Sequence, residues 1–334
     1  MMLKKENTDS GKIRLVYILA ASHSGSTLLS MLLGAHPEIC TAGELKATSL
    51  DDTENYLCSC REKIKKCPFW TGISNDMAAR RFSFDITNSG TDFRSGASRY
   101  VRRLLAPLHR APLLEKVRDL ALNLSPAWRE QLPKIQAINT NFMDSILNRT
   151  GKKIIVDSSK IGIRLKYLLQ NPSLDVLVIR LIRDGRGVVL TYTDPANFAD
   201  ASDPHLRQGG TGGNRESERL SIADAALEWR RSNEEAEAII SQLDTSRWIE
   251  VRYEDLCTNK DKTLHRLFIF IGVDPEQAVS DFRSVEHHVI GNGMRLDSTS
   301  EIRLDERWRS RLSPADLKVF ESVAGKLNSR LGYQ

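Results

Sequence analysis

The chain has 334 residues, of which 40% are hydrophobic and 27% are charged, so it is long enough to bury a large core and has the composition of a globular enzyme. Its 48 Lys and Arg residues outnumber 43 Asp and Glu residues, which gives a net charge of +5. This excess is too small to indicate wrapping of nucleic acid or coating of a membrane, but it suits a polyanionic cofactor.

The first apolar run, residues 13–21, is too short to cross a bilayer, which takes about 20 residues. The run also lacks the small-residue cleavage pattern of a signal peptide. We therefore expect no transmembrane segment and a cytoplasmic protein.

The first structural unit is a strand, a turn and a helix. Residues 13–19 form a nearly continuous apolar run, which is typical of a buried parallel strand, and residues 22–27 interrupt it. Residues 28–33 place apolar side chains on every side of a helix, so we expect a buried helix that ends near Gly34.

The same alternation continues along the chain. Three further aliphatic or β-branched runs predict strands, and three periodic segments predict helices. The strands are residues 154–156, 176–182 and 248–251, and the helices are residues 161–169, 223–243 and 261–271. Alternating strands and helices predict an α/β protein with a central, mostly parallel sheet between two layers of helices.

We interpret residues 1–334 as a single domain. Two of its segments depart from the alternation of strands and helices. Residues 71–150 carry Arg-rich helical patterns at 99–105, 113–122 and 135–147, and predict a helical insertion or subdomain that forms one wall of a substrate site. The patterns are separated by Pro107, Pro112, Pro126 and Pro133. Residues 193–218 are rich in Gly and Pro with few apolar residues, and predict a mobile loop.

The turn between the first strand and its helix has the features of an anion site. Backbone N–H groups and the positive end of a helix dipole would converge there, and Gly25 would let a phosphate approach the backbone. A Ser-rich turn that merely caps the helix is the alternative. The candidate cofactor contacts are Ser22, His23, Ser24, Gly25, Ser26 and Thr27.

The turn lacks the Gly-Lys-Ser/Thr ending of a P-loop, which argues against a standard ATPase or GTPase. His23-Ser24-Gly25-Ser26-Thr27 resembles instead the basic-Ser-Gly-Ser/Thr-Thr loop of sulfotransferases that use 3′-phosphoadenosine-5′-phosphosulfate (PAPS). The resemblance implies a P-loop-like fold, PAPS as the sulfuryl donor and adenosine 3′,5′-bisphosphate as its product. Family members usually carry Lys or Arg where this chain has His23. Nearby anions would favour a charged imidazole there, or another cation takes that role.

The resemblance extends to a second phosphate site. The predicted strand 176–182 leads into Arg183, and Thr191 follows eight positions later, a spacing with which sulfotransferases hold the 3′-phosphate. Arginine suits this group because its guanidinium can bind phosphate through two hydrogen bonds. The resemblance adds Tyr253, Asn292 and Arg295 as candidate cofactor contacts. Tyr253 could equally be a core residue at a strand end.

Sulfuryl transfer to a hydroxyl requires a general base within hydrogen-bond reach. The segment containing Gly43 and Glu44 resembles the base-bearing segment of tyrosyl-protein and related sulfotransferases, so we predict Glu44 as the base, with Glu38 a weaker candidate and a solvated Glu44 the alternative. Lys160 and His23 are the predicted catalytic cations, since Lys160 closes a core strand at the edge where ligands bind.

No metal site is predicted, because Cys58, Cys60 and Cys67 do not give the paired C-x₂-C ligands of a structural zinc site. Their spacing leaves free thiols, a disulfide and a metal site open. Two rival functions also stay open, a kinase-like nucleotide phosphotransferase and a non-catalytic nucleotide-binding protein. The sequence indicates neither the class of hydroxyl acceptor nor the oligomeric state.

Overall fold

A computed structural model describes residues 11–46, 54, 56–106, 112–195 and 219–334. The described residues form a five-stranded sheet in the order β2-β3-β1-β4-β5, and each neighbouring pair is parallel. The strands are β1 (Ile13–Ala20), β2 (Ile39–Thr41), β3 (Ile154–Lys160), β4 (Leu174–Ile182) and β5 (Trp248–Arg252). The predicted α/β class and parallel sheet are confirmed. Only β2 was missed, because three residues are too few for a pattern.

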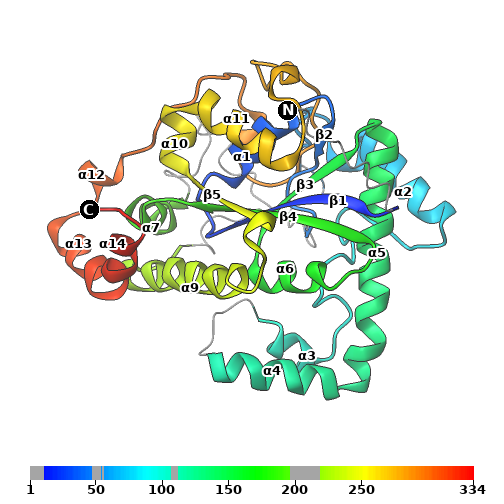
Figure 1. Cartoon of the computed structure of the whole chain (residues 1–334), viewed down its shortest axis with the longest axis horizontal. Coiled ribbons are helices and arrows are strands. Elements are labelled where there is room, and N and C mark those ends of the chain that lie inside the picture. The colour runs from blue at the N-terminus through cyan, green and yellow to red at the C-terminus, as the bar shows by residue number, and fades with distance from the viewer. Residues whose placement is uncertain (1–10, 47–53, 55, 107–111, 196–218) are drawn as a thin grey trace, which may run out of the picture.

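Helices cover both faces of the sheet (Figure 1). One face carries α1 (Ser26–Gly34), α10 (Tyr253–Thr258) and α11 (Lys260–Ile271), and the other carries α6 (Gly162–Leu169) and α9 (Ile222–Ile240). Beyond the β4 end lie α7 (Gly185–Thr193), α12 (Trp308–Arg311), α13 (Pro314–Phe320) and α14 (Lys326–Arg330).

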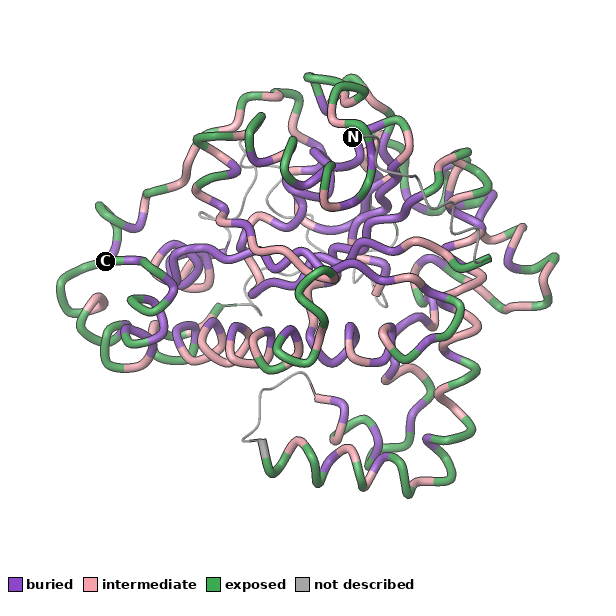
Figure 2. Tube along the Cα trace, in the orientation of Figure 1, coloured by how far each residue is buried: buried purple, intermediate pink, exposed green. Residues whose placement is uncertain are grey.

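The central strand β1 shows why the predicted apolar run is continuous. Its side chains alternate between two separate cores, with Leu15 and Tyr17 in one and Val16 and Ile18 in the other. Figure 2 shows β1, β3 and β4 mainly buried between the helical layers, whereas the edge strand β5 is mostly of intermediate exposure. A strand with helices on both faces must be apolar on both, so its sequence does not alternate.

The predicted insertion is helical, but one of its helices is longer than expected. It contains most of α2 (Pro68–Ala79), and α3 (Arg99–Leu104), α4 (Pro112–Leu124) and α5 (Pro126–Thr150). Figure 1 shows α3 and α4 beside one end of α5, away from the sheet. The expectation that Pro133 separates two elements was wrong, because Pro133 lies inside α5. Ser125 caps this helix, and buried Trp128 and Ile135 fix its first turns on the same core.

Two further expectations concern a transmembrane segment and a mobile loop. None of the helices in the described part of the chain is both long enough and apolar enough to cross a membrane. The predicted mobile loop of residues 193–218 begins at the end of α7, and its residues 196–218 lie outside the described ranges. The Leu220 N–H donates to the Tyr192 carbonyl at 2.9 Å, so the chain returns to the place where it left.

The partly buried Glu235 of α9 makes stability depend on pH. Its carboxyl group lies against Gly162 of α6, and burial raises its pKa from 4.5 to about 7, with Glu115 adding to the effect. As pH rises from 4.5 through 7, the unfolded chain ionises first, so the free energy of unfolding falls.

We therefore expect Glu235→Gln to raise the free energy of unfolding at pH 8 by about 2 kcal/mol and to have little effect below pH 5. Urea denaturation at both pH values measures this difference. Glu234→Gln, at the neighbouring position with its carboxylate 3.7 Å from Arg230, is the matched control and should change neither value appreciably. Equal effects of the two substitutions would contradict the assignment.

Candidate active site

The candidate site lies between β1 and β4, where the order in which the chain adds strands to the sheet reverses. From β1 the chain crosses to the edge strand β2, whereas from β4 it proceeds to the opposite edge strand β5. The loops after β1 and β4 therefore diverge at the carboxyl ends of two adjacent strands, which is the position at which open α/β sheets bind ligands. Here Arg183 Nη1 donates to the backbone carbonyl of His23 at 2.7 Å, so the two predicted phosphate sites are in direct contact.

The loop after β1 holds an unusual backbone conformation. His23 has a φ of 61° and Gly25 a φ of 88°, both in the left-handed region. A Cβ at position 25 would lie 2.6 Å from the ring of Tyr253, so only glycine fits there. This conformation turns the chain sharply from β1 into α1.

The end of this loop suits an anion. The first turn of α1 contains no acidic residue, and no side chain caps it. The Ser24 side chain is 1% exposed, and its hydroxyl has no hydrogen-bond partner within the described structure. Ser26 and Thr27 are buried in the first turn of α1, whereas Ser22 is partly exposed. An unpaired buried hydroxyl beside a helix N-terminus fits a phosphate or sulfate oxygen.

Arg183 is 2% exposed and is held on two sides. Its guanidinium lies 4.3 Å from the centre of the Tyr253 ring and 2.9 Å from a carboxylate oxygen of Asp305. Burial raises the pKa of Asp305, but Arg307 and Arg183 outweigh it and lower that pKa to about 2. No local sequence pattern indicates Asp305, because it lies 122 residues from Arg183. The Asp305 carboxylate thus pairs with the guanidinium that we predicted to bind a phosphate.

The segment around Tyr253 supports the turn after β4. Glu254 accepts a hydrogen bond from the Asp184 N–H at 3.0 Å and another from the Tyr333 hydroxyl at 2.8 Å. Tyr253 itself packs between Gly25 and Arg183. Its ring therefore contacts residues of both predicted phosphate sites, and it also belongs to a buried hydrophobic cluster, so its role in cofactor binding stays a prediction.

Thr191 lies in α7, and His23 contacts the neighbouring residue of the same helix. Thr191 is buried, and its hydroxyl donates to the Gly187 carbonyl at 3.3 Å. Gly187 lies against the Arg183 side chain, so Thr191 is one helical turn from that contact. The His23 ring packs edge-on against Tyr192, with ring centres 4.6 Å apart. The residue after Thr191 thus contacts the loop after β1, and the role of Thr191 in phosphate binding stays a prediction.

Glu44 and Lys160 form an ion pair in which Lys160 Nζ donates to Glu44 Oε1. Both side chains are largely buried, with 20% and 15% of their surface exposed. Lys160 ends β3 after a register shift in its pairing with β1, and its φ of 70° lies in the left-handed region. A non-glycine residue in this region costs about 1–3 kcal/mol, and such strain often accompanies a functional site. Glu38, the weaker base candidate, pairs instead with Lys153 at 2.7 Å.

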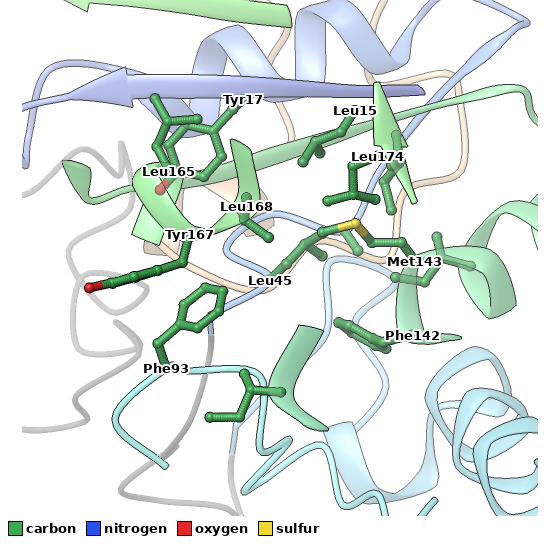
Figure 3. Packing of buried hydrophobic residues seen from close by; sticks show 14 of the residues in the cluster. Leu15, Tyr17, Leu45, Phe93, Phe142, Met143, Leu165, Tyr167, Leu168 and Leu174 are labelled. Atoms are coloured by element: carbon green, nitrogen blue, oxygen red, sulfur yellow. The ribbon is translucent and has the colours of Figure 1, made fainter. Parts of the chain in front are cut away.

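The backbone around Glu44 is fixed by both neighbouring segments. Gly43 has a φ of 83°, and a Cβ there would lie 2.0 Å from the Ile290 carbonyl oxygen, so glycine is required. The Glu44 N–H donates to that same carbonyl at 3.3 Å. Leu45 is buried in the hydrophobic cluster that includes Phe93 and Met143 (Figure 3). These contacts hold the Glu44 backbone between β3 and residue 290.

Asp157 is a positioning residue that the sequence did not reveal. It is fully buried in β3 and accepts hydrogen bonds from the Leu45 N–H at 3.2 Å and the Ser159 N–H at 2.9 Å. Arg164 of α6 pairs with its other oxygen at 3.0 Å. One buried carboxylate thus joins the segment after Glu44 to the strand end before Lys160.

Asn292 and Arg295 lie in the segment after Ile290. Asn292 accepts a hydrogen bond from the Met294 N–H at 3.0 Å. Arg295 is 2% exposed and donates to the Gly291 and Leu57 carbonyls, each at 2.7 Å. These contacts anchor residues 291–296 beside Glu44, and the predicted roles of both residues in cofactor binding stay predictions.

A pocket lies next to the Glu44 and Lys160 segments. It is lined by Lys46, Asp92, Phe93, Arg94, Leu105, Ile161, Ile163 and Arg164. Asp92 lies 4.0 Å from Lys46 and 2.9 Å from Arg94. Several lining residues come from the helical insertion, so the insertion contributes to a wall near the candidate base.

The fold is an α/β fold in which a P-loop-like turn joins β1 to α1. The model of the sulfotransferase family matches residues 175–277, which include Arg183 and Tyr253. The sulfotransferase domain from the curacin biosynthetic pathway has a similar fold, with a TM-score of 0.50 and 17% identity over 96% of this chain and 98% of that one.

Two carbohydrate sulfotransferases also match about half of the chain. Carbohydrate sulfotransferase 1 of Mus musculus is 26% identical over 185 residues, and its Homo sapiens counterpart is 24% identical over 180 residues. Each match covers 51% of this chain and 42% of the relative, so the chain spans less than half the length of these curated relatives. The chain is thus similar to sulfotransferases in sequence over about half of its length and to a sulfotransferase domain in fold over most of it.

The Asp157 network predicts a large effect on stability. Asp157→Asn leaves the buried Arg164 guanidinium without its counter-charge, so we expect the free energy of unfolding to fall by about 3–5 kcal/mol. Asp175→Asn is the matched control, because its ion pair with Arg247 is about one-third exposed and should contribute less than about 1 kcal/mol. Chemical denaturation of the two variants measures both effects. Losses of similar size would show that Asp157 does not organise this edge of the sheet.

Proposed function

We propose that this protein transfers the sulfuryl group of PAPS to an acceptor hydroxyl, with Glu44 as the general base. The observation that carries this proposal is the pairing of two anion sites through the contact between Arg183 and the His23 carbonyl. A donor with phosphate groups at both its 5′ and 3′ positions needs two such sites at a fixed separation. A donor with phosphates only on its 5′ side would leave Arg183 unused.

The loop after β1 would bind the 5′-phosphosulfate. Its N–H groups at the start of α1 and the unpaired Ser24 hydroxyl supply donors, and the helix dipole favours negative charge. Arg183 would bind the 3′-phosphate in place of the Asp305 carboxylate, with Thr191 nearby on α7. Tyr253, which contacts Gly25 and Arg183, would keep the two sites at their spacing.

Glu44 would accept the proton of the acceptor hydroxyl as the hydroxyl oxygen forms a bond to sulfur. The bond between sulfur and the bridging oxygen breaks, and its electron pair stays on the 5′-phosphate of the departing adenosine 3′,5′-bisphosphate. Lys160 orients Glu44 through their ion pair, and with His23 it supplies positive charge near the reacting group. The transfer then leaves one proton on Glu44 for release to water.

The acceptor would enter by the pocket beside Lys46 and Arg94, since this pocket is lined in part by Ile161, the residue that follows Lys160. The matched relatives are named carbohydrate sulfotransferases, which makes a carbohydrate hydroxyl the first acceptor class to test. A kinase-like phosphotransferase is less favoured, because the loop has no lysine in the P-loop position.

The cofactor assignment predicts selectivity for a 3′-phosphate. Adenosine 3′,5′-bisphosphate should bind much more tightly than ADP, and Arg183→Ala should weaken the bisphosphate about ten- to a hundredfold, because a charge-assisted hydrogen bond contributes roughly 1.5–3 kcal/mol. Asp305→Asn should strengthen it, since the phosphate no longer displaces a carboxylate. Isothermal titration calorimetry measures all three.

Arg186→Ala is the control for this experiment. Arg186 pairs with Asp184 at 2.7 Å and stacks on Trp308, so it lies in the same turn without touching the proposed phosphate site. Its loss should leave the affinity for the bisphosphate nearly unchanged. Equal affinities of the parent protein for ADP and the bisphosphate would overturn the assignment of the donor.

The assigned roles of Glu44 and His23 predict two different failures. Glu44→Gln should lower kcat by about 10²–10⁴ and leave the affinity for the bisphosphate nearly unchanged, because only the proton acceptor is lost. His23→Ala should lower both, since the imidazole would contact the donor before and during transfer. A non-catalytic binding protein would show no activity for Glu44→Gln to lower.

His23→Arg tests the charge on this residue. Activity of the parent should decline above the pKa of the donor-bound imidazole, whereas the Arg variant should stay active at higher pH. A pH–rate profile of both proteins on one working hydroxyl acceptor makes the comparison. Identical alkaline limbs, or a loss of bisphosphate affinity in Glu44→Gln equal to its loss of turnover, would refute these roles.

A further inference from the structure

Four side chains of types that commonly bind metal ions lie together, apart from the proposed catalytic groups. Cys58, Cys60, Cys67 and His288 place their Sγ and imidazole nitrogen atoms within 4.8 Å of one another. The sequence could not show this set, because His288 lies 221 residues after Cys67. We propose that these residues bind one structural Zn²⁺ ion as a Cys₃His site.

The distances between the ligand atoms fit tetrahedral zinc. Zn–S bonds of about 2.3 Å and Zn–N bonds of about 2.0–2.1 Å put two sulfurs about 3.8 Å apart and a sulfur and a nitrogen about 3.6 Å apart. Cys60 Sγ and Cys67 Sγ are 3.6 Å apart, and His288 Nδ1 lies 3.7 Å from Cys58 Sγ and 3.6 Å from Cys67 Sγ. The side chains thus already surround a point where an ion would have four ligands.

The second nitrogen of His288 has the partner that a metal-bound imidazole usually has. Its Nε2 lies 3.2 Å from a Glu286 carboxylate oxygen, which places the ring proton on Nε2 and leaves the Nδ1 lone pair facing the thiols. The ring also stacks on Phe69, with centres 4.2 Å apart and an angle of 5° between planes. Its orientation is therefore fixed on two sides.

The surroundings favour thiolates and admit an ion. Cys67 is the N-cap residue of the 12-residue helix α2, where the helix dipole stabilises negative charge. Cys58 and Cys67 are fully buried, whereas Cys60 and His288 are partly exposed and give a path from solvent. A disulfide would use only two of the three thiols. It would not explain why the His288 imidazole faces the thiols and pairs with Glu286 on its other side.

The ion would join two segments that reach the proposed active site. Ser59, between two of the ligands, accepts a hydrogen bond through Oγ from the Val289 N–H at 2.8 Å. Two residues after His288, the Ile290 carbonyl accepts the Glu44 N–H. Four protein ligands leave no open position for substrate, so the ion would be structural and would hold the segment against which Glu44 rests.

Metal analysis of the purified full chain tests this proposal. Protein purified without chelator should contain about one zinc per chain, and Cys67→Ser and His288→Ala should lose most of it. Cys257→Ser, which lies outside the cluster, should keep it. His288→Cys should also keep zinc, because a fourth thiolate can replace the imidazole, and this variant tests the ligand role should His288→Ala fail to fold.

Two measurements on the parent protein complete the test. Co²⁺ added after chelation should give the thiolate charge-transfer and visible bands of tetrahedral cobalt, and chelation should lower Tm by about 10 °C. Thiol titration of denatured, chelated protein should find all five cysteines reduced. Metal-free protein that gives no tetrahedral cobalt spectrum, or a disulfide between two of the three cysteines, would overturn the proposal. None of these readouts requires sulfuryl transfer, so they stand apart from the proposed function.

Discussion

The contact between the Arg183 guanidinium and the His23 carbonyl is the constraint on which the site depends. It links the end of β4 to the loop after β1, at the point where the connections of the sheet diverge. The Tyr253 ring packs against both segments, because it lies beside the Arg183 guanidinium and against Gly25 of the loop after β1. A small shift of either strand would therefore disturb both anion sites together.

A second set of contacts holds the proposed base. The Glu44 backbone rests between Ile290 and the end of β3, and the buried Asp157 carboxylate ties the next residue to that strand. Lys160, at the bulged end of the same strand, pairs with the Glu44 side chain. The proposed zinc ion would secure the residue 288–290 side of this arrangement. Base and cation thus both depend on the conformation at the end of β3.

The sequence predicted those features that local patterns determine. Continuous apolar runs identified four of the strands in the described sheet, because strands covered on both faces lack alternation, and Gly25 and Arg183 stood out by their positions after such runs. Asp157 was missed because burial of a carboxylate in a strand follows no sequence pattern. Asp305 was missed because its ion-pair partner, Arg183, lies 122 residues away in the sequence. The sequence also did not bring His288 together with the three cysteines, because it lies 221 residues after Cys67. Pro133 misled the prediction, since tertiary packing of Trp128 sustains the helix before it.

The central claim is that two phosphate groups of one nucleotide occupy the loop after β1 and Arg183. A crystal structure of the protein with adenosine 3′,5′-bisphosphate tests it most directly. We predict that the 5′-phosphate lies at the start of α1, within hydrogen-bond distance of the Ser24 hydroxyl, and that the 3′-phosphate lies on Arg183 with the Asp305 carboxylate displaced. A nucleotide bound elsewhere, or a complex in which Asp305 still pairs with Arg183 and the 3′-phosphate faces solvent, would contradict it.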